Sequence, residues 1–281
     1  MKKLFITMMG LLVVIGCNQK PKSYSYDDED EEDECEELKL KAYKFSETDG
    51  IAHVDVHVEY PVKGETKLVD AIRTYIANHV ELESDEVELS DGQGVIDFYG
   101  RNLMTEMKSL AADYMDDDYV TEVYHDWTFT KLCETDLFVT FHSQSDIYEG
   151  GLHGVGYEEG ISFFQDDGSQ FTADMLRRTA SPDFQKLVRQ GLRAYFASDG
   201  QELTDEQLAE ELIVVADVND IPLPQADPYL SSDGVTFIYQ PYEISYFAAG
   251  LPTFTIPMEQ MKPFLTQKAI KKLWPDDEDD E

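Results

Sequence analysis

The alternation of apolar and polar residues predicts its clearest strand near residue 50. Between Ile51 and Tyr60 every second residue is apolar, and histidines and acidic residues fall between them. A period of two is typical of a strand with one buried face. Pro61 follows this run and is expected to end the strand.

Two amphipathic helices are predicted next. Apolar residues recur at i, i+4 spacing over 67–80 and again over 94–115, which is the spacing of one helix face. Ser181-Pro182 is a strong helix start, because serine caps the helix and proline suits its first turn. The other predicted elements are a hairpin of strands at 120–132 and 137–145, a strand ending at 164, helices at 182–197 and 204–212, strands at 235–239 and 253–256, and one terminal helix at 258–273.

This order of elements predicts an α+β fold. Strand pairs joined by tight turns alternate with helices, which indicates a largely antiparallel sheet packed with helices. We divide the chain into a signal peptide (1–16), a lipidated cysteine with an acidic tether (17–38), an N-terminal segment (39–135), a C-terminal domain (136–273) and an acidic tail (274–281).

The N-terminus reads as the signal of a bacterial lipoprotein. Two lysines precede an apolar run at 4–15, which is shorter than the roughly 20 residues that span a bilayer. Val14-Ile15-Gly16-Cys17 resembles the lipobox of bacterial lipoproteins. That resemblance implies cleavage before Cys17 and an anchor of acyl chains on it. A plain signal peptide with a chance cysteine is the alternative.

The net charge narrows the choice of partners. Acidic residues outnumber basic ones 58 to 22, and the formal net charge is −36. Removing the acidic run at 27–37 and the tail at 276–281 still leaves an acidic excess. Binding to nucleic acid is therefore not expected, since phosphates require a basic patch. The charge suits a cationic partner, divalent metals or simple solubility.

The acidic run also bears on location. It repels itself and cannot bury a core, so we expect an extended, disordered tether. Acidic residues after a lipidated cysteine are similar to the surface-export signals of Bacteroidetes lipoproteins, although here the run begins ten residues after Cys17. We expect the outer membrane of a Gram-negative bacterium and hypothesise surface exposure, which protease shaving of intact cells tests. Full protection from the protease would contradict it.

Two further cysteines, Cys35 and Cys133, remain. An envelope compartment permits a disulfide between them. Cys35 lies within the acidic run, so a core thiol at Cys133 without a partner is the alternative.

Two motifs resemble a known family. Tyr148 to Gly154 reads YEGGLHG, and Asp233 to Pro257 reads DGVTFIYQPYEISYFAAGLPTFTIP. In this order they resemble an extracytoplasmic domain family of unknown function. That family forms the external half of the lysozyme-sensing anti-sigma factor RsiV and accompanies the catalytic domain of the peptidoglycan deacetylase PdaC. Ser245-Tyr246-Phe247 stands where the family commonly has Ala-Pro-Tyr.

The resemblance covers roughly residues 40–268. It implies an envelope role and one composite α+β unit made of an N-terminal segment and an RsiV-like C-terminal domain. It carries no activity over to this chain.

His153 is the most suggestive single residue. Gly150, Gly151 and Gly154 around it permit positive φ angles and close approach of another group. The imidazole could bind a metal or act as acid or base. Alternatively, its ring nitrogens bond to nearby backbone and hold the turn.

Tyr242 and Glu243 are the second pair of candidates. They could line a pocket with His153 and Gly151, or form a structural corner between Pro241 and Gly250. His153 and Glu243 are thus the candidate catalytic residues, although no nucleophile motif or P-loop occurs.

Metal sites and cofactors are not expected. His53 and His57 share a strand face but lie about 13 Å apart at roughly 3.3 Å per residue, too far to share one metal. His125 and His142 have no evident ligand cluster.

The function favoured by these observations is a lipid-anchored binding or sensing domain. Its ligand would be a peptidoglycan or glycan fragment, or a cationic protein such as lysozyme. The alternatives are a cell-wall hydrolase or deacetylase-like enzyme centred on His153 and Glu243, and a structural component of an envelope assembly.

Overall fold

Five strands form the larger of two sheets. The computed structural model describes residues 37–83, 86–114, 119–197 and 203–275, and all of them belong to one compact unit. The strands lie in sequence order, β1-β2-β3-β4-β5, and every pair is antiparallel except β2 and β3. They are β1 (Lys39–Asp49), β2 (Ala52–Lys63), β3 (Val123–Glu134), β4 (Phe138–Tyr148) and β5 (Val155–Phe164).

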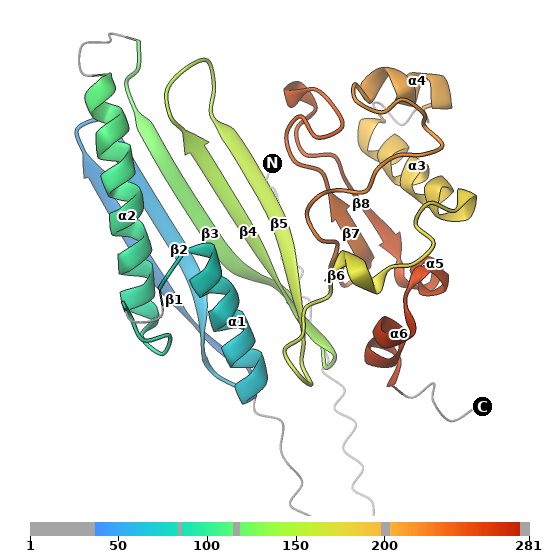
Figure 1. Cartoon of the computed structure of the whole chain (residues 1–281), viewed down its shortest axis with the longest axis horizontal. Coiled ribbons are helices and arrows are strands. Elements are labelled where there is room, and N and C mark those ends of the chain that lie inside the picture. The colour runs from blue at the N-terminus through green and yellow to red at the C-terminus, as the bar shows by residue number, and fades with distance from the viewer. Residues whose placement is uncertain (1–36, 84–85, 115–118, 198–202, 276–281) are drawn as a thin grey trace, which may run out of the picture. The chain divides into compact units, whose positions relative to one another are not determined.

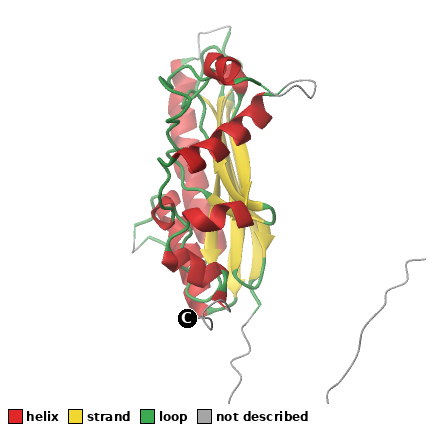
Figure 2. Cartoon of the chain, turned by 90° about the vertical axis from the view of Figure 1, so that its right-hand side faces the viewer, coloured by secondary structure: helices red, strands yellow, loops and turns green. Residues whose placement is uncertain are grey.

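Two helices cover one face of this sheet (Figure 1). α1 (Thr66–His79) and α2 (Gly92–Asp113) connect β2 to β3, because parallel neighbours require a crossover connection. The alternation predicted for β2 holds, and Val54, Val56 and Val58 are fully buried beneath the helices. Figure 2 shows these helices on one side of the strands. The opposite face carries polar side chains in phase on β2, β3 and β4.

A second core surrounds a three-stranded antiparallel sheet of order β6-β7-β8. Its longest helix is α3, where Ser181 Oγ accepts a hydrogen bond from Phe184 N, as the Ser-Pro start predicted. The elements are β6 (Tyr229–Ser231), β7 (Gly234–Ile238), β8 (Thr253–Pro257), α3 (Pro182–Phe196), α4 (Asp205–Glu211), α5 (Met258–Met261) and α6 (Gln267–Leu273), with short 3-10 turns at Ala173–Met175, Phe247–Ala249 and Lys262–Phe264.

Leu230 on β6 ties the two sheets together. Its N–H donates to Ser162 Oγ at 2.8 Å, and its carbonyl accepts from Thr140 Oγ1 at 2.7 Å. Gly160 lies beneath the ring of Tyr229, where an added Cβ would collide with the ring. The sheets therefore pack closely at the end of β5.

The α+β prediction is confirmed, with two corrections to its elements. Pro61 does not end the strand, because β2 continues to Lys63. The pairing of β2 with β3 ends at Val58, so the N–H that Pro61 lacks is not needed for that ladder. The terminal helix is broken, since Pro263 cannot continue an α-helix and Leu265 is extended. β1 and β6 were not predicted.

Several predictions concern N-terminal residues and cysteines that the structure does not describe. Cys17, Cys35 and the acidic run before Glu37 lie outside the described residues, so lipidation and the disulfide stay predictions. Cys133 is half-buried, and its Sγ lies 3.8 Å from the Leu230 carbonyl oxygen. Among the residues described, none of the helices is both long and apolar enough to cross a membrane.

Candidate functional site

The turn between β4 and β5 contains Gly151 and His153, two of the predicted site residues. Gly150 and Gly151 adopt positive φ angles of 90° and 110°, as their residue type suggested. Tyr148 donates its hydroxyl to the Gly151 carbonyl at 3.0 Å, and Tyr114 donates to the Glu149 carbonyl at 3.0 Å. The Gly151 carbonyl thus helps to hold the turn. A Cβ added at Gly151 would meet no atom within 4 Å.

His153 is exposed at the end of this turn. Its Nδ1 lies 2.8 Å from the Gly154 carbonyl oxygen, and since a carbonyl only accepts, Nδ1 carries the proton in this contact. The ring stacks on Phe247 with centroids 4.0 Å apart and planes inclined by 22°. The imidazole therefore makes the predicted contact with nearby backbone, together with an aromatic contact that the sequence did not suggest.

Tyr242 reaches the same phenylalanine from the other motif. It has a φ of 66° and is 55% exposed, and its ring stacks on Phe247 at 5.6 Å. The structure thus brings His153 and Tyr242 into contact with the same ring, that of Phe247. We call these three residues the aromatic cluster.

Glu243 supports the chain beneath this cluster. Its Oε1 accepts from Gln225 N at 2.6 Å and its Oε2 from Gln240 N at 2.8 Å. Both carboxylate oxygens are therefore engaged by backbone donors, which fits the structural-corner interpretation. Its role in binding or catalysis stays a prediction.

Gln240 links this corner to β5. Its Nε2 donates to the Glu158 carbonyl at 2.7 Å, and its Oε1 accepts from Glu158 N at 3.2 Å. The side-chain amide thereby pairs with the strand as a neighbouring backbone would.

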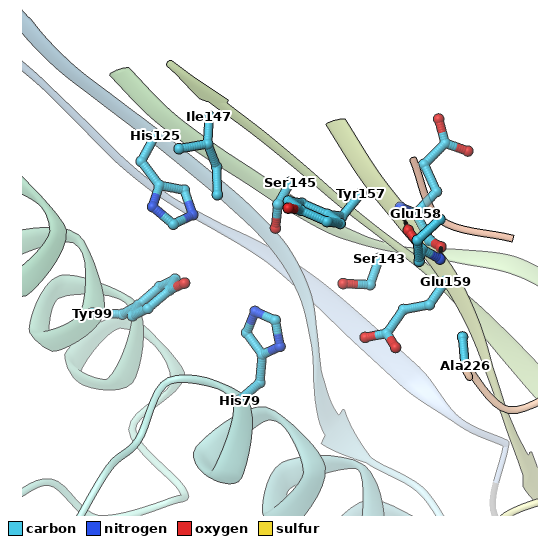
Figure 3. A pocket seen from close by; sticks show the side chains of 11 residues that line it. His79, Tyr99, His125, Ser143, Ser145, Ile147, Tyr157, Glu158, Glu159 and Ala226 are labelled. Atoms are coloured by element: carbon cyan, nitrogen blue, oxygen red, sulfur yellow. Dashed lines mark hydrogen bonds between the residues drawn. The ribbon is translucent and has the colours of Figure 1, made fainter. Parts of the chain in front are cut away.

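Next to Gln240 lies a pocket of about 370 Å³, within the range of small-molecule sites. Figure 3 shows His79, Tyr99 and His125 on one side and Ser143, Ser145, Tyr157 and Glu159 on the other. The pocket is lined by His79, Tyr99, His125, Ser143, Ser145, Ile147, Tyr157, Glu158, Glu159, Ala226 and Gln240.

Trp127 positions the inner wall of this pocket. His79, the last residue of α1, stacks on the buried indole with centroids 4.3 Å apart, and Tyr99 of α2 meets it edge-on at 5.3 Å. The indole Nε1 donates to Ser143 Oγ at 3.0 Å.

Burial keeps the polar rings of this wall uncharged near neutral pH. Burial lowers the pKa of His79. Burial also lowers the pKa of His125 from 6.5 to about 4, and the positive charge that His79 would carry contributes to this shift. Burial and the charges of Glu106 and Glu81 raise the pKa of Tyr99 to about 12. The imidazoles can therefore donate or accept hydrogen bonds without carrying charge.

Glu159 contributes a carboxylate from β5. Its Oε1 accepts a hydrogen bond from the Tyr75 hydroxyl at 2.7 Å, and its side chain points into the cavity (Figure 3). Glu158 next to it points away and approaches His142 Nε2 at 3.2 Å.

The described part of the chain contains no group of three or more His, Cys, Asp or Glu side chains arranged to hold a metal ion. Burial raises the pKa of the Cys133 thiol, which disfavours the nucleophilic thiolate.

Sequence reasoning missed this pocket. The available signal was the polar residues Ser143, Ser145 and Glu159, which stand in phase with apolar residues on the buried face of β4 and β5.

We predict that Glu243→Gln lowers the free energy of unfolding by about 1–2 kcal/mol, because an amide N–H replaces one acceptor beside a backbone N–H. His153→Ala, at an exposed position, should cost less than about 0.5 kcal/mol. Urea denaturation of both variants measures this. Equal losses would contradict the assignment of Glu243 as the support.

We predict that His125 makes folding sensitive to acid. Its folded pKa lies below its unfolded value, so its stabilising contribution is complete above pH 6.5 and is lost as the pH falls to about 4. Wild type should lose on the order of 2 kcal/mol more than His125→Gln over this window, allowing for partial exposure of the ring. Parallel melting curves from pH 7.5 to pH 4 would contradict this.

Comparisons with known proteins support the fold. A search of the curated proteins finds no match. The structure is similar to that of a DUF3298 family member from Bacteroides fragilis NCTC 9343, with a TM-score of 0.64 and 19% identity over 86% of this chain and 99% of the other. A DUF3298 family protein from Pseudomonas aeruginosa PAO1 gives a TM-score of 0.50 and 13% identity over 84% and 96%. Residues 171–259 match the model of the family described as "Protein of unknown function (DUF3298)".

Proposed function

We propose that this chain is a lipid-anchored, extracytoplasmic binding protein whose pocket takes a glycan fragment of the cell envelope. The lipobox at Cys17 and the resemblance of its motifs to the RsiV and PdaC domains support the location.

The pocket is the observation that carries this proposal. Saccharides present many hydroxyl groups and an apolar ring face, so their sites combine hydrogen-bonding groups with aromatic rings. Here uncharged imidazoles and serine hydroxyls lie beside Tyr99 and Tyr157. Tyr157 is 44% exposed and stands at the entrance.

The aromatic cluster offers a further contact surface, and Glu243 beside it accepts a hydrogen bond from the N–H of Gln240, which lines the pocket. Tyr242 and His153 would meet a longer ligand, while Glu243 and Gly151 hold the two loops that carry them. We therefore keep a role in binding for all four residues: Tyr242 and His153 would contact the ligand, and Glu243 and Gly151 would support the loops.

A second candidate function is binding of a cationic protein such as lysozyme. On the sheet face without helices, Asp126 pairs in register with Asp55 on one side and Asp146 on the other. Like charges directly opposite each other are unfavourable. Burial and these two neighbouring charges raise the pKa of Asp126, and His53, whose Nε2 lies 3.7 Å from Asp126 Oδ1, offsets only part of this rise. A basic side chain placed across this row would relieve the repulsion.

We predict that Cys17→Ser abolishes incorporation of labelled palmitate and moves the protein out of the membrane fraction, since the thiol forms the thioether to the diacylglyceryl group and cleavage and N-acylation depend on it. Cys133→Ser serves as the matched control and should retain the label. Labelling that persists in Cys17→Ser would contradict the anchor.

We predict that Tyr157→Ala weakens binding of peptidoglycan-derived saccharides by about tenfold, because it removes an aromatic contact at the entrance. Isothermal titration calorimetry measures this. Tyr119→Ala is the control, as Tyr119 is 93% exposed and does not line the pocket. Equal affinity of the two variants would count against the pocket.

For the second candidate, Asp126→Asn should weaken lysozyme binding several-fold, on the order of threefold to tenfold, and reduce its dependence on salt. Asp233→Asn, at an exposed position outside the row, is the control. Unchanged affinity for lysozyme in Asp126→Asn would exclude this face.

A further inference from the structure

We propose that the pocket recognises an ammonium group, so that its preferred saccharide is an amino sugar with a free amine rather than an N-acetylated, neutral or anionic one. This inference rests on the proposed function and names the ligand class of the same pocket.

The charges around the cavity favour a cationic ligand. None of the residues that line it is lysine or arginine, whereas Glu159 turns its carboxylate inward (Figure 3). The Tyr75 hydroxyl fixes Oε1 of that carboxylate at 2.7 Å. The other acidic residue of the lining, Glu158, points away and is occupied by His142.

The two imidazoles do not reverse this balance. His79 and His125 are the basic residues of the lining, and burial lowers the pKa of both, so that each is neutral near pH 7. An anionic ligand would therefore meet a carboxylate without a compensating cation, which is unfavourable. A cationic ligand meets one negative charge and uncharged acceptors.

Aromatic rings supply the second independent feature. Tyr99 and Tyr157 flank the cavity (Figure 3), and the face of a phenol ring attracts an ammonium group. Tyr99 is held by its edge-on contact with Trp127 at 5.3 Å. Proteins use aromatic rings in this way to bind organic cations, and here the Glu159 carboxylate adds a negative charge to the same cavity.

Hydroxyl groups then favour a saccharide among the possible amines. Ser143 Oγ accepts from the Trp127 Nε1–H at 3.0 Å, which leaves its own proton to donate. Ser145 lies two residues further along the same face of β4. A small alkylamine would leave these groups unpaired, whereas a sugar ring offers partners for them.

The experiment is isothermal titration calorimetry of the full chain in detergent with glucosamine, N-acetylglucosamine and glucose. At about pH 7 we expect glucosamine to bind at least about tenfold more tightly than the other two. Glu159→Gln should lower its affinity about tenfold without changing that of N-acetylglucosamine. Glu210→Gln, which changes an exposed carboxylate on α4 outside the pocket, should behave as wild type.

Two checks keep the outcome clear. Gln at 159 still offers an acceptor to Tyr75, and an unchanged melting temperature verifies that the variant is folded. In wild type, raising the pH above the pKa of the sugar amine should abolish the preference, because the amine becomes neutral. Equal binding of all three saccharides would overturn the ammonium inference but support the glycan function. Binding of none of them would overturn both.

Discussion

The candidate site depends on the stacking of His79 on Trp127. The indole is fully buried in the larger core, and its contacts reach residues on α1, α2 and β4. His79, Tyr99 and Ser143 all line the pocket, and each takes its position from this one side chain. Loss of the indole would therefore disturb the core and the pocket wall together, so the two cannot be altered independently.

The position of the pocket follows from a change of polarity along two strands. On β4, the buried Val139 and Phe141 are followed on the same face by Ser143 and Ser145. On β5, the same face passes from Phe163 and Ile161 to Glu159 and Tyr157. α1 ends at His79, where this change occurs. The sheet extends beyond the helix that covers it, and its polar end becomes one wall of a cavity.

Local patterns in the sequence predicted most of the elements. The alternation around Val56 and the cap at Ser181 depend on neighbouring residues, and both predictions are correct. β1 was missed because it is an exposed edge strand whose lysines obscure the alternation. Pro61 and the broken terminal helix show that proline acts according to the hydrogen bonds around it, which the sequence alone does not display.

The candidate site was predictable only in part. The two motifs suggested that His153 and Tyr242 lie close together, and both pack on Phe247. Phe247 itself was not predicted as a site residue. The pocket unites His79, His125 and Glu159, whose proximity depends on strand register and on where α1 ends. No local spacing contains that information.

The pairing of the Gln240 side chain with Glu158 has a consequence for self-association. A sheet with five strands has two edges, and each exposes backbone groups that another chain could extend. At one edge Gln240 satisfies the backbone N–H and carbonyl of Glu158 on β5. At the other, Lys39, Lys41 and Lys44 place positive charges along β1. Both edges of the sheet are thus protected from edge-to-edge aggregation, and the lysines on β1 are among the few basic residues of a very acidic chain.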